Sequence, residues 1–185
     1  MLAATAALAA GARYPNELPA FRLHQAAAWG KLEPLVSTAE DVRRILGEPS
    51  KPDGRASSKS PAPAGAPPVL EYDGGPDWRI RIYFVGSDPT ARTWFADSIQ
   101  DRLLSVDLLP VKPVPFEGKP IPPAFKTRRV IDGGSAWDEY ADGTGLVYKV
   151  AAARTPEEDP QPRTLLRISY GPSDEATRKH ARTVQ

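Results

Sequence analysis

Residues Val36–Gly47 read V-S-T-A-E-D-V-R-R-I-L-G, and this stretch predicts an amphipathic helix around which the fold is built. We expect Ser37 to cap the helix and Glu40, three residues later, to bind back to the amide of the cap. Gly47 suits the left-handed conformation in which many helices end, and a proline two positions later prevents continuation. The sequence therefore predicts a helix over Ser37–Leu46.

One side of this helix carries a narrow apolar stripe. Val42, Ile45 and Leu46 fall at positions i, i+3 and i+4, so they lie on one face. Burial of each side chain contributes about 2 kcal/mol. Such a helix needs a surface on which to pack, and the segments that follow predict the sheet that provides it.

The composition excludes several classes of function. The chain has 185 residues, 41% of them hydrophobic and 25% charged, as is typical of globular proteins. A net charge of +1 gives no electrostatic case for nucleic acid as a partner. Without cysteine, and with only His24 and His180, the chain has almost no material for a metal site or a Ser-His-Asp triad. We predict no cofactor and no metal.

The beginning of the chain is similar to an export signal. Residues 1–12 are small and apolar and end in Ala10-Gly11-Ala12, like the hydrophobic part and cleavage site of a signal peptide. The usual basic segment is missing, so we expect a truncated signal peptide; an alanine-rich helical or disordered start is the alternative. The stretch is too short for a transmembrane span. We expect a secreted or periplasmic protein, with a cytoplasmic one as the alternative.

Residues 13–110 predict the first of two units. An ordered lead-in over 13–35 precedes the helix, and residues 51–68 lack large apolar side chains and predict a mobile loop. Val69–Tyr72 and Trp78–Phe84 then predict a hairpin, because apolar and polar residues alternate strictly in its second arm.

A third strand is expected at Leu103–Leu109, with Leu104, Val106 and Leu108 facing the core. A short turn of helix near Trp94 is expected to precede this strand.

The second unit follows a proline-rich linker at residues 111–123 and occupies residues 124–172, with a C-terminal tail at 173–185. Its three predicted strands are Trp137–Tyr140, Leu146–Val150 and Thr164–Tyr170. Ala124–Ile131 reads as extended. Short matches between the halves, such as L-L-S-V-D-L-L-P and L-L-R-I-S-Y-G-P, predict a tandem repeat that shares one sheet.

The run Leu32–Pro49, followed by three antiparallel strands, resembles the BamE (SmpA/OmlA) and beta-lactamase-inhibitor-protein group. The beginning Tyr14–Pro19 and the Trp-Asp-x-Tyr motif at Trp137–Tyr140 resemble uncharacterised exported bacterial proteins of that group. The resemblance implies helices packed on a curved antiparallel sheet. The lipobox cysteine of BamE lipoproteins is absent, so the resemblance implies a fold rather than a role.

The candidate partner-binding residues lie on strands. Polar side chains of the first hairpin are expected on one open sheet face together with two from the second unit: Arg79, Arg81, Tyr83, Lys149 and Arg167. Arginine and tyrosine are frequent in protein interfaces. The alternative is an ordinary solvated face of an antiparallel sheet.

A hydrolase-type enzyme is the alternative function, with an Asp/Glu site at the junction of the two halves. Its candidates are Asp138, Glu139 and Asp142, although Asp138 and Glu139 are expected to face opposite sides of a strand. The glycines at 133–134 and 143–145 fit neither a nucleophile elbow nor a phosphate-binding loop.

Together these patterns predict an α+β protein: a curved antiparallel sheet of two three-stranded units, with a short helix packed on one face. Trp78 and Trp137 are expected to cover the core, and Trp29 and Trp94 to be more exposed. The predicted function is a non-enzymatic, exported binding module that contacts a protein or a cell-envelope component through its open sheet face.

Overall fold

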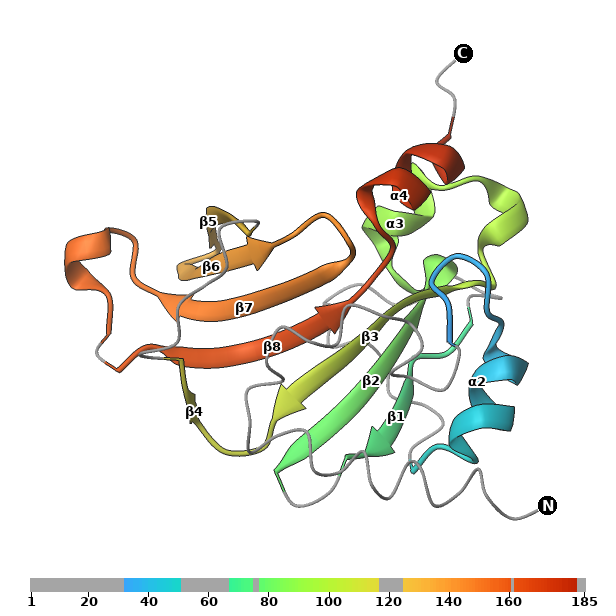
Figure 1. The fold of residues 1–185 in the computed structure, drawn as a ribbon, viewed down its shortest axis with the longest axis horizontal. Helices are drawn as coiled ribbons and strands as arrows, with labels where there is room; N and C mark the ends of the chain where they lie inside the picture. Colours follow the sequence, from blue (N-terminus) through green and yellow to red (C-terminus); the bar gives the residue numbers. More distant parts are fainter. Residues whose placement is uncertain (1–31, 51–66, 75–76, 117–124, 161, 183–185) are drawn as a thin grey trace.

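The computed structural model describes residues 32–50, 67–74, 77–116, 125–160 and 162–182 (Figure 1). Several predicted features lie outside the described residues. They are the signal peptide at residues 1–12, nearly all of the lead-in with Trp29, and almost the whole loop at 51–68.

The predicted helix is present as α2, Ala39–Leu46, and ends at Gly47 with a positive φ of 81°. The prediction of Ser37 as its cap was wrong. Thr38 caps the helix, since its Oγ1 accepts from the amide of Asp41 at 3.2 Å and an Asp41 carboxylate oxygen accepts from the Thr38 amide at 2.9 Å. The Ser37 hydroxyl instead accepts from the amide of Glu33 at 2.9 Å and stabilises the preceding turn.

The apolar stripe of α2 packs on the sheet as predicted. Val42 is completely buried, and Ile45 and Leu46 are partly buried against the same core. At the end of the helix the Tyr72 hydroxyl donates to the Gly47 carbonyl at 3.1 Å, and burial raises the pKa of Tyr72 to about 12.

The sheet has 8 strands, and every pairing in it is antiparallel. Its order is β1-β2-β3-β8-β7-β6-β5, with β4 pairing to β8 outside this path. The strands are β1 (Leu70–Asp73), β2 (Trp78–Phe84), β3 (Leu103–Pro110), β4 (Val114–Pro115), β5 (Lys126–Asp132), β6 (Ser135–Ala141), β7 (Leu146–Ala152) and β8 (Thr164–Tyr170). Figure 1 shows that this sheet is strongly curved and that α2 lies beside β1 and β2.

The two halves of the chain share this sheet, and they meet where β3 pairs with β8, with Val106 opposite Tyr170. The predicted fold class is therefore confirmed: an α+β protein with an antiparallel sheet and a helix on one face. The last strand of each half therefore lies at the centre of the sheet, beside the last strand of the other half.

The second half contains a strand more than predicted. The segment that reads as extended forms β5, which pairs along its whole length with β6. Gly133 and Gly134, with φ values of 53° and 92°, form the two-residue turn between them, a conformation that side chains rarely adopt. Within the predicted linker, Val114 pairs with Leu165, so residues 111–116 are partly incorporated in the sheet.

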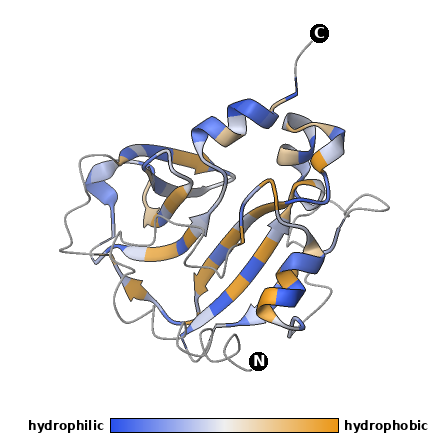
Figure 2. Ribbon diagram, turned by 45° about the vertical axis from the view of Figure 1, so that its right-hand side comes forward, coloured by the Kyte–Doolittle hydropathy of each residue, from blue (hydrophilic) through white to orange (hydrophobic). Residues whose placement is uncertain are grey.

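Alternation on β2 is as predicted, with Trp78, Ile80, Ile82 and Phe84 all buried. Figure 2 shows hydrophobic and hydrophilic residues alternating along β2 and β3. On β3 the expectation for Leu104 was wrong: Leu103 is buried in the main core, and the register shifts at the Tyr83–Phe84 step. Leu104 consequently packs against a separate apolar cluster.

That separate cluster lies at one end of the sheet. It contains Leu35, Val85, Ala91, Phe95 and Ile99, with Leu104 and Ala176 packed against them. The helices that contribute to it are α3 (Pro89–Trp94), as predicted near Trp94, and α4 (Asp174–His180) in the C-terminal tail. Short 3-10 turns at Val85–Ser87 and Asp97–Ile99 complete this end, and a third occurs at Pro156–Glu158.

The tryptophans are not all buried or exposed as predicted. Trp78 is 2% exposed and belongs to the core, and Trp94 is 64% exposed, both as expected. Trp137 does not cover the core. Asp138 and Tyr140 are the buried residues of β6, and Trp137 lies an odd number of positions from both, so it points to the opposite face.

Candidate interaction face

The candidate site is the outer face of the sheet, by which we mean the face opposite the main hydrophobic core. Arg79, Arg81 and Tyr83 alternate with buried residues of β2 and therefore point to this face. Directly opposed residues of paired strands share a face, so the register extends the outer face across the sheet. One row contains Glu71, Arg81, Asp107 and Ser169, and another contains Arg167, Lys149, Glu139 and Arg128.

At the β1 end of this face Glu71 holds two arginines. Its carboxylate oxygens lie 3.0 Å from Nε of Arg81 and 3.5 Å from Nε of Arg79. Burial is the largest single effect and lowers the pKa of Arg81, but the hydrogen bonds and charges of Glu71 and Tyr83 together outweigh it and the pKa is raised. The carboxylate thus fixes both guanidinium groups on the face.

At the centre of the face Asp107 pairs with Arg167, whose Nη1 lies 3.0 Å from Oδ2 of Asp107. Burial raises the pKa of Asp107, and this effect is larger than the opposing effect of Arg167. Burial, together with the nearby Asp107, also raises the pKa of Tyr83. This pair joins the two halves of the chain, because Asp107 is on β3 and Arg167 is on β8.

Toward the β5 edge the face carries a tryptophan covered by a lysine. The ammonium of Lys149 lies 3.3 Å from the ring centroid of Trp137, which is cation–π geometry. Burial lowers the pKa of Lys149, with a further contribution from Arg167. The indole Nε1 of Trp137 donates to Glu139 at 3.0 Å, and Arg128 pairs with the other oxygen of Glu139 at 2.6 Å.

Charge on the outer face is layered. The carboxylates lie deep, with side-chain exposures of 8% for Glu71, 3% for Asp107 and 20% for Glu139. Their partners are more exposed, at 49% for Arg79, 35% for Arg167 and 75% for Arg128. The groups that an approaching molecule meets first are therefore guanidinium groups, although the face contains acids beneath them.

The structure brings all five predicted residues to this one face, and it adds others. Glu71, Asp107, Arg128 and Trp137 were not among the candidates. Alternation around Tyr140, if that residue is taken as buried, would have placed Trp137 and Glu139 on the outer face. Arg128 could not be assigned to this face from the sequence, because its strand was not predicted.

A second polar cluster lies on the core side of the sheet. Asp138 accepts two hydrogen bonds from Arg129, at 2.8 and 2.9 Å, and another from Arg163 at 2.7 Å. Asp159 accepts from Arg129 at 2.6 Å and from the Ala153 amide at 2.8 Å, so the loop between β7 and β8 is fastened to β5. The hydrogen bond from Arg129, followed by that from Arg163, lowers the pKa of Asp138 against the effect of burial.

The three acids of the alternative enzyme hypothesis do not converge on one place. Asp138 is on the core side and Glu139 is on the outer face, as the strand geometry predicts. Asp142 accepts from the amide and hydroxyl of Thr144, which stabilises the turn between β6 and β7. Burial is the largest single effect on the pKa of Glu139 and would raise it, but hydrogen bonds from Trp137 and Arg128 and the nearby arginine charges together lower the pKa.

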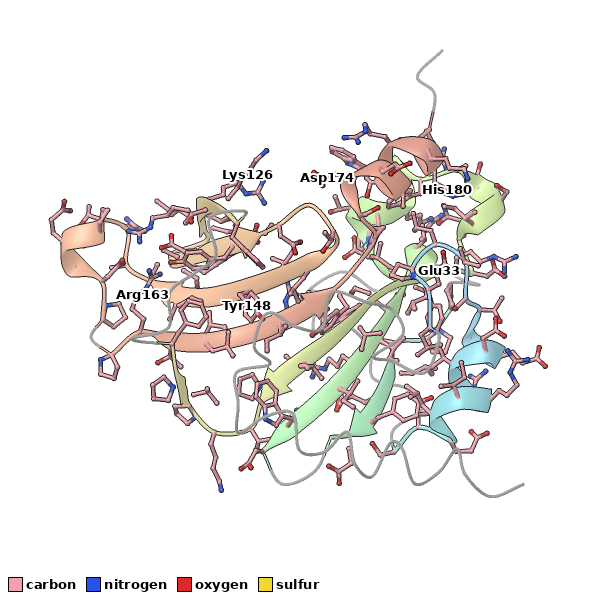
Figure 3. All side chains as sticks on the ribbon, viewed as in Figure 1. Glu33, Lys126, Tyr148, Arg163, Asp174 and His180 are labelled. Carbon is pink, nitrogen blue, oxygen red and sulfur yellow. The ribbon has the colours of Figure 1, made fainter. Side chains whose placement is uncertain are left out.

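A cavity of about 220 Å³ does lie at the junction of the halves, and its lining includes Glu33, Leu103, Thr144 and Tyr170. Arg163, which holds Asp138, lies at the opposite end of the sheet from Glu33 and Asp174 (Figure 3). The cavity and the Asp138 cluster are therefore separate features. Within the described ranges no group of 3 or more His, Cys, Asp or Glu residues is arranged to hold a metal ion.

No protein-family model matches the chain, and no curated protein or solved structure matches it. The fold and the site therefore define its class by themselves: an α+β protein with an open antiparallel sheet and a polar, cation-covered outer face. Among the helices that the structure describes, none is long and apolar enough to cross a membrane. The resemblance to the BamE and beta-lactamase-inhibitor-protein group stays a prediction.

Proposed function

We propose that this protein is a non-enzymatic binding module whose outer face takes an acidic, extended segment of a partner protein. The observation that carries the proposal is the layering of charge, with exposed arginines above buried carboxylates. An incoming carboxylate meets guanidinium groups already fixed in position by Glu71, Asp107 and Glu139. Fixed donors reduce the entropy lost on binding.

The aromatic groups on this face support a protein partner. Trp137 under Lys149 and Tyr83 beside Arg81 combine aromatic rings with positive charge. Tryptophan, tyrosine and arginine are the residues that most often dominate binding energy in protein interfaces. The residue types therefore suit an acidic segment that also carries apolar side chains.

We propose further that the protein acts outside the cytoplasm, as the signal-like residues 1–12 suggest. The resemblance to exported proteins supports the same location. Mass determination of the mature N-terminus after expression with the natural upstream codons tests this part: cleavage after Ala12 supports export, and an uncleaved cytosolic product contradicts it.

A titration followed by nuclear magnetic resonance tests the binding proposal. The probe is a short glutamate-rich peptide with interspersed tyrosine, and the control peptide has lysine in place of every glutamate. We expect the acidic peptide to shift the amide signals of outer-face residues such as Arg79, Tyr83 and Lys149. Shifts that gather on α3 and α4, or equal binding of both peptides, would contradict the proposal.

A further inference from the structure

The strand β5 ends the sheet, and no described segment pairs with its outer edge, which we call the free edge and treat as a second interaction surface. It is 7 residues long and pairs on one side with β6. Lys126, Thr127, Ile131 and Asp132 are exposed, with Ile131 at 55%. A long exposed edge strand is a template for pairing with another strand.

The direction of the backbone groups on β5 follows from its hairpin. A two-residue turn joins Asp132 to Ser135, and the pair flanking such a turn exchanges hydrogen bonds. Alternate residues from Asp132 backwards therefore bond to β6. The N–H and C=O groups of Thr127, Arg129 and Ile131 consequently point away from β6, toward the free edge.

The charges of β5 divide into two kinds. Arg128 pairs with Glu139, and Arg129 pairs with Asp138 and Asp159, so both arginines already have acidic partners within the chain. Lys126 and Asp132, at the two ends of the strand, form no ion pair with another described side chain. Their charges have opposite sign. When two copies of this edge lie antiparallel, each Lys126 therefore faces an Asp132 of the other copy.

We propose that β5 pairs with β5 of a second copy of this chain, antiparallel, about a twofold axis at Arg129. Lys126 of each copy then lies opposite Asp132 of the other, Arg128 opposite Val130, and Thr127 opposite Ile131. All edge-facing backbone groups of Thr127, Arg129 and Ile131 become paired, because they form the hydrogen-bonded positions of the new ladder.

The two central arginines do not oppose this pairing. Each guanidinium is drawn back toward β6 by its two hydrogen bonds to Asp138 and is matched by Asp159. The exposed Ile131 gains a β-branched cross-strand neighbour in Thr127 of the other copy, a favourable pair in sheets. The twofold axis also places the outer faces of both copies on the same side of the joined sheet. The inference does not rest on the proposed function.

Charge exchange tests this dimer. The probe is the purified protein alone, and its mass is followed by analytical ultracentrifugation over a range of concentrations. A single strand pair is a small interface, so we expect a weak dimer that appears only at high concentration. Lys126→Asp and Asp132→Lys are each expected to weaken the dimer at least roughly 5-fold, since each brings like charges together.

The double variant Lys126→Asp/Asp132→Lys restores opposite charges and is expected to restore the dimer. Thr127→Pro gives a second test, because it removes an amide that faces the free edge and leaves the bonds to β6 in place. We expect it to be monomeric with an unchanged circular dichroism spectrum.

A wild type that stays monomeric at every concentration overturns the proposal. A dimer whose affinity is the same in the wild type and in the charge variants overturns the proposal as well, since its interface then lies elsewhere. If Thr127→Pro fails to fold, the three charge variants decide the question by themselves.

Discussion

Asp107 and Asp138 are both buried carboxylates, yet their pKa values move in opposite directions. Asp107 lies at the centre of the outer face, and burial raises its pKa in spite of Arg167. Asp138 receives hydrogen bonds from both Arg129 and Arg163, and these lower its pKa in spite of burial. The balance between burial and the charged donors around an acid therefore decides the sign of the shift.

We expect Asp107→Asn to melt at or above the wild-type temperature at neutral pH. The folded protein holds the Asp107 proton more tightly than the unfolded chain, whose pKa is near 3.8. Stability from this group is therefore present below that pH and lost as the pH rises through the higher folded pKa. Melting curves over a pH series check this, and the difference between the proteins should vanish in acid.

A variant that melts several degrees below the wild type at neutral pH would contradict this expectation. It would mean that ionised Asp107 stabilises the fold through Arg167.

Asp138→Asn should destabilise the protein by roughly 2 kcal/mol at neutral pH, because two half-buried arginine donors lose a charged, buried acceptor. The folded pKa of Asp138 is below 3.8, so its contribution is present above that pH and is lost as the pH falls through the folded pKa. Urea unfolding at neutral and acidic pH measures both effects.

The adjacent Glu139→Gln is the matched control, because its partner Arg128 is 75% exposed; its effect should stay below about 1 kcal/mol. An equal decrease in the free energy of unfolding for the two variants would show that the Asp138 cluster has no special structural role.

At the scale of elements, helix α2 shows how far local patterns go. Its existence, its apolar stripe and its end at Gly47 follow from the sequence. Its first residue does not, since Ser37-x-x-Glu40 and Thr38-x-x-Asp41 are overlapping capping patterns. The structure uses the second because the Ser37 hydroxyl is engaged with the Glu33 amide.

Thr38→Ala should therefore reduce the free energy of unfolding by about 1 kcal/mol. Glu40→Ala should leave it nearly unchanged, because Glu40 takes no part in the cap. Chemical denaturation of the two variants measures both values. A larger loss for Glu40→Ala than for Thr38→Ala would assign the cap to the first pattern after all.

The strands that escaped prediction share a physical reason. Lys126–Asp132 contains four charged residues and no clear alternation, because an edge strand exposes both its edge and much of its faces. Val114–Pro115 is too short and too rich in proline to be distinguished from a linker. Only tertiary pairing, with β6 and with β8, makes these segments strands.

At the scale of the whole molecule, the curved antiparallel sheet and the common face of the five candidates follow from the alternation of residues. The position of Trp137 does not, because an aromatic residue suits the core as well as an interface. The ion pairs also join distant segments, such as Asp107 with Arg167. Periodicity reveals which face a residue occupies but not its partner across the sheet.

Binding of an acidic peptide to matched variants tests the central claim most directly. Arg79→Ala/Arg128→Ala removes two exposed cations from the outer face, and Arg92→Ala/Lys179→Ala removes two exposed cations from α3 and α4. Isothermal titration with the glutamate-rich peptide, at low and at high salt, compares them at equal net charge.

We predict that the outer-face variant binds roughly 2- to 30-fold more weakly than the wild type, since exposed charge pairs contribute about 0.2–1 kcal/mol each. The loss should shrink at high salt, and the control should bind like the wild type. Equal affinities of the two variants would contradict the assignment of the outer face as the binding surface.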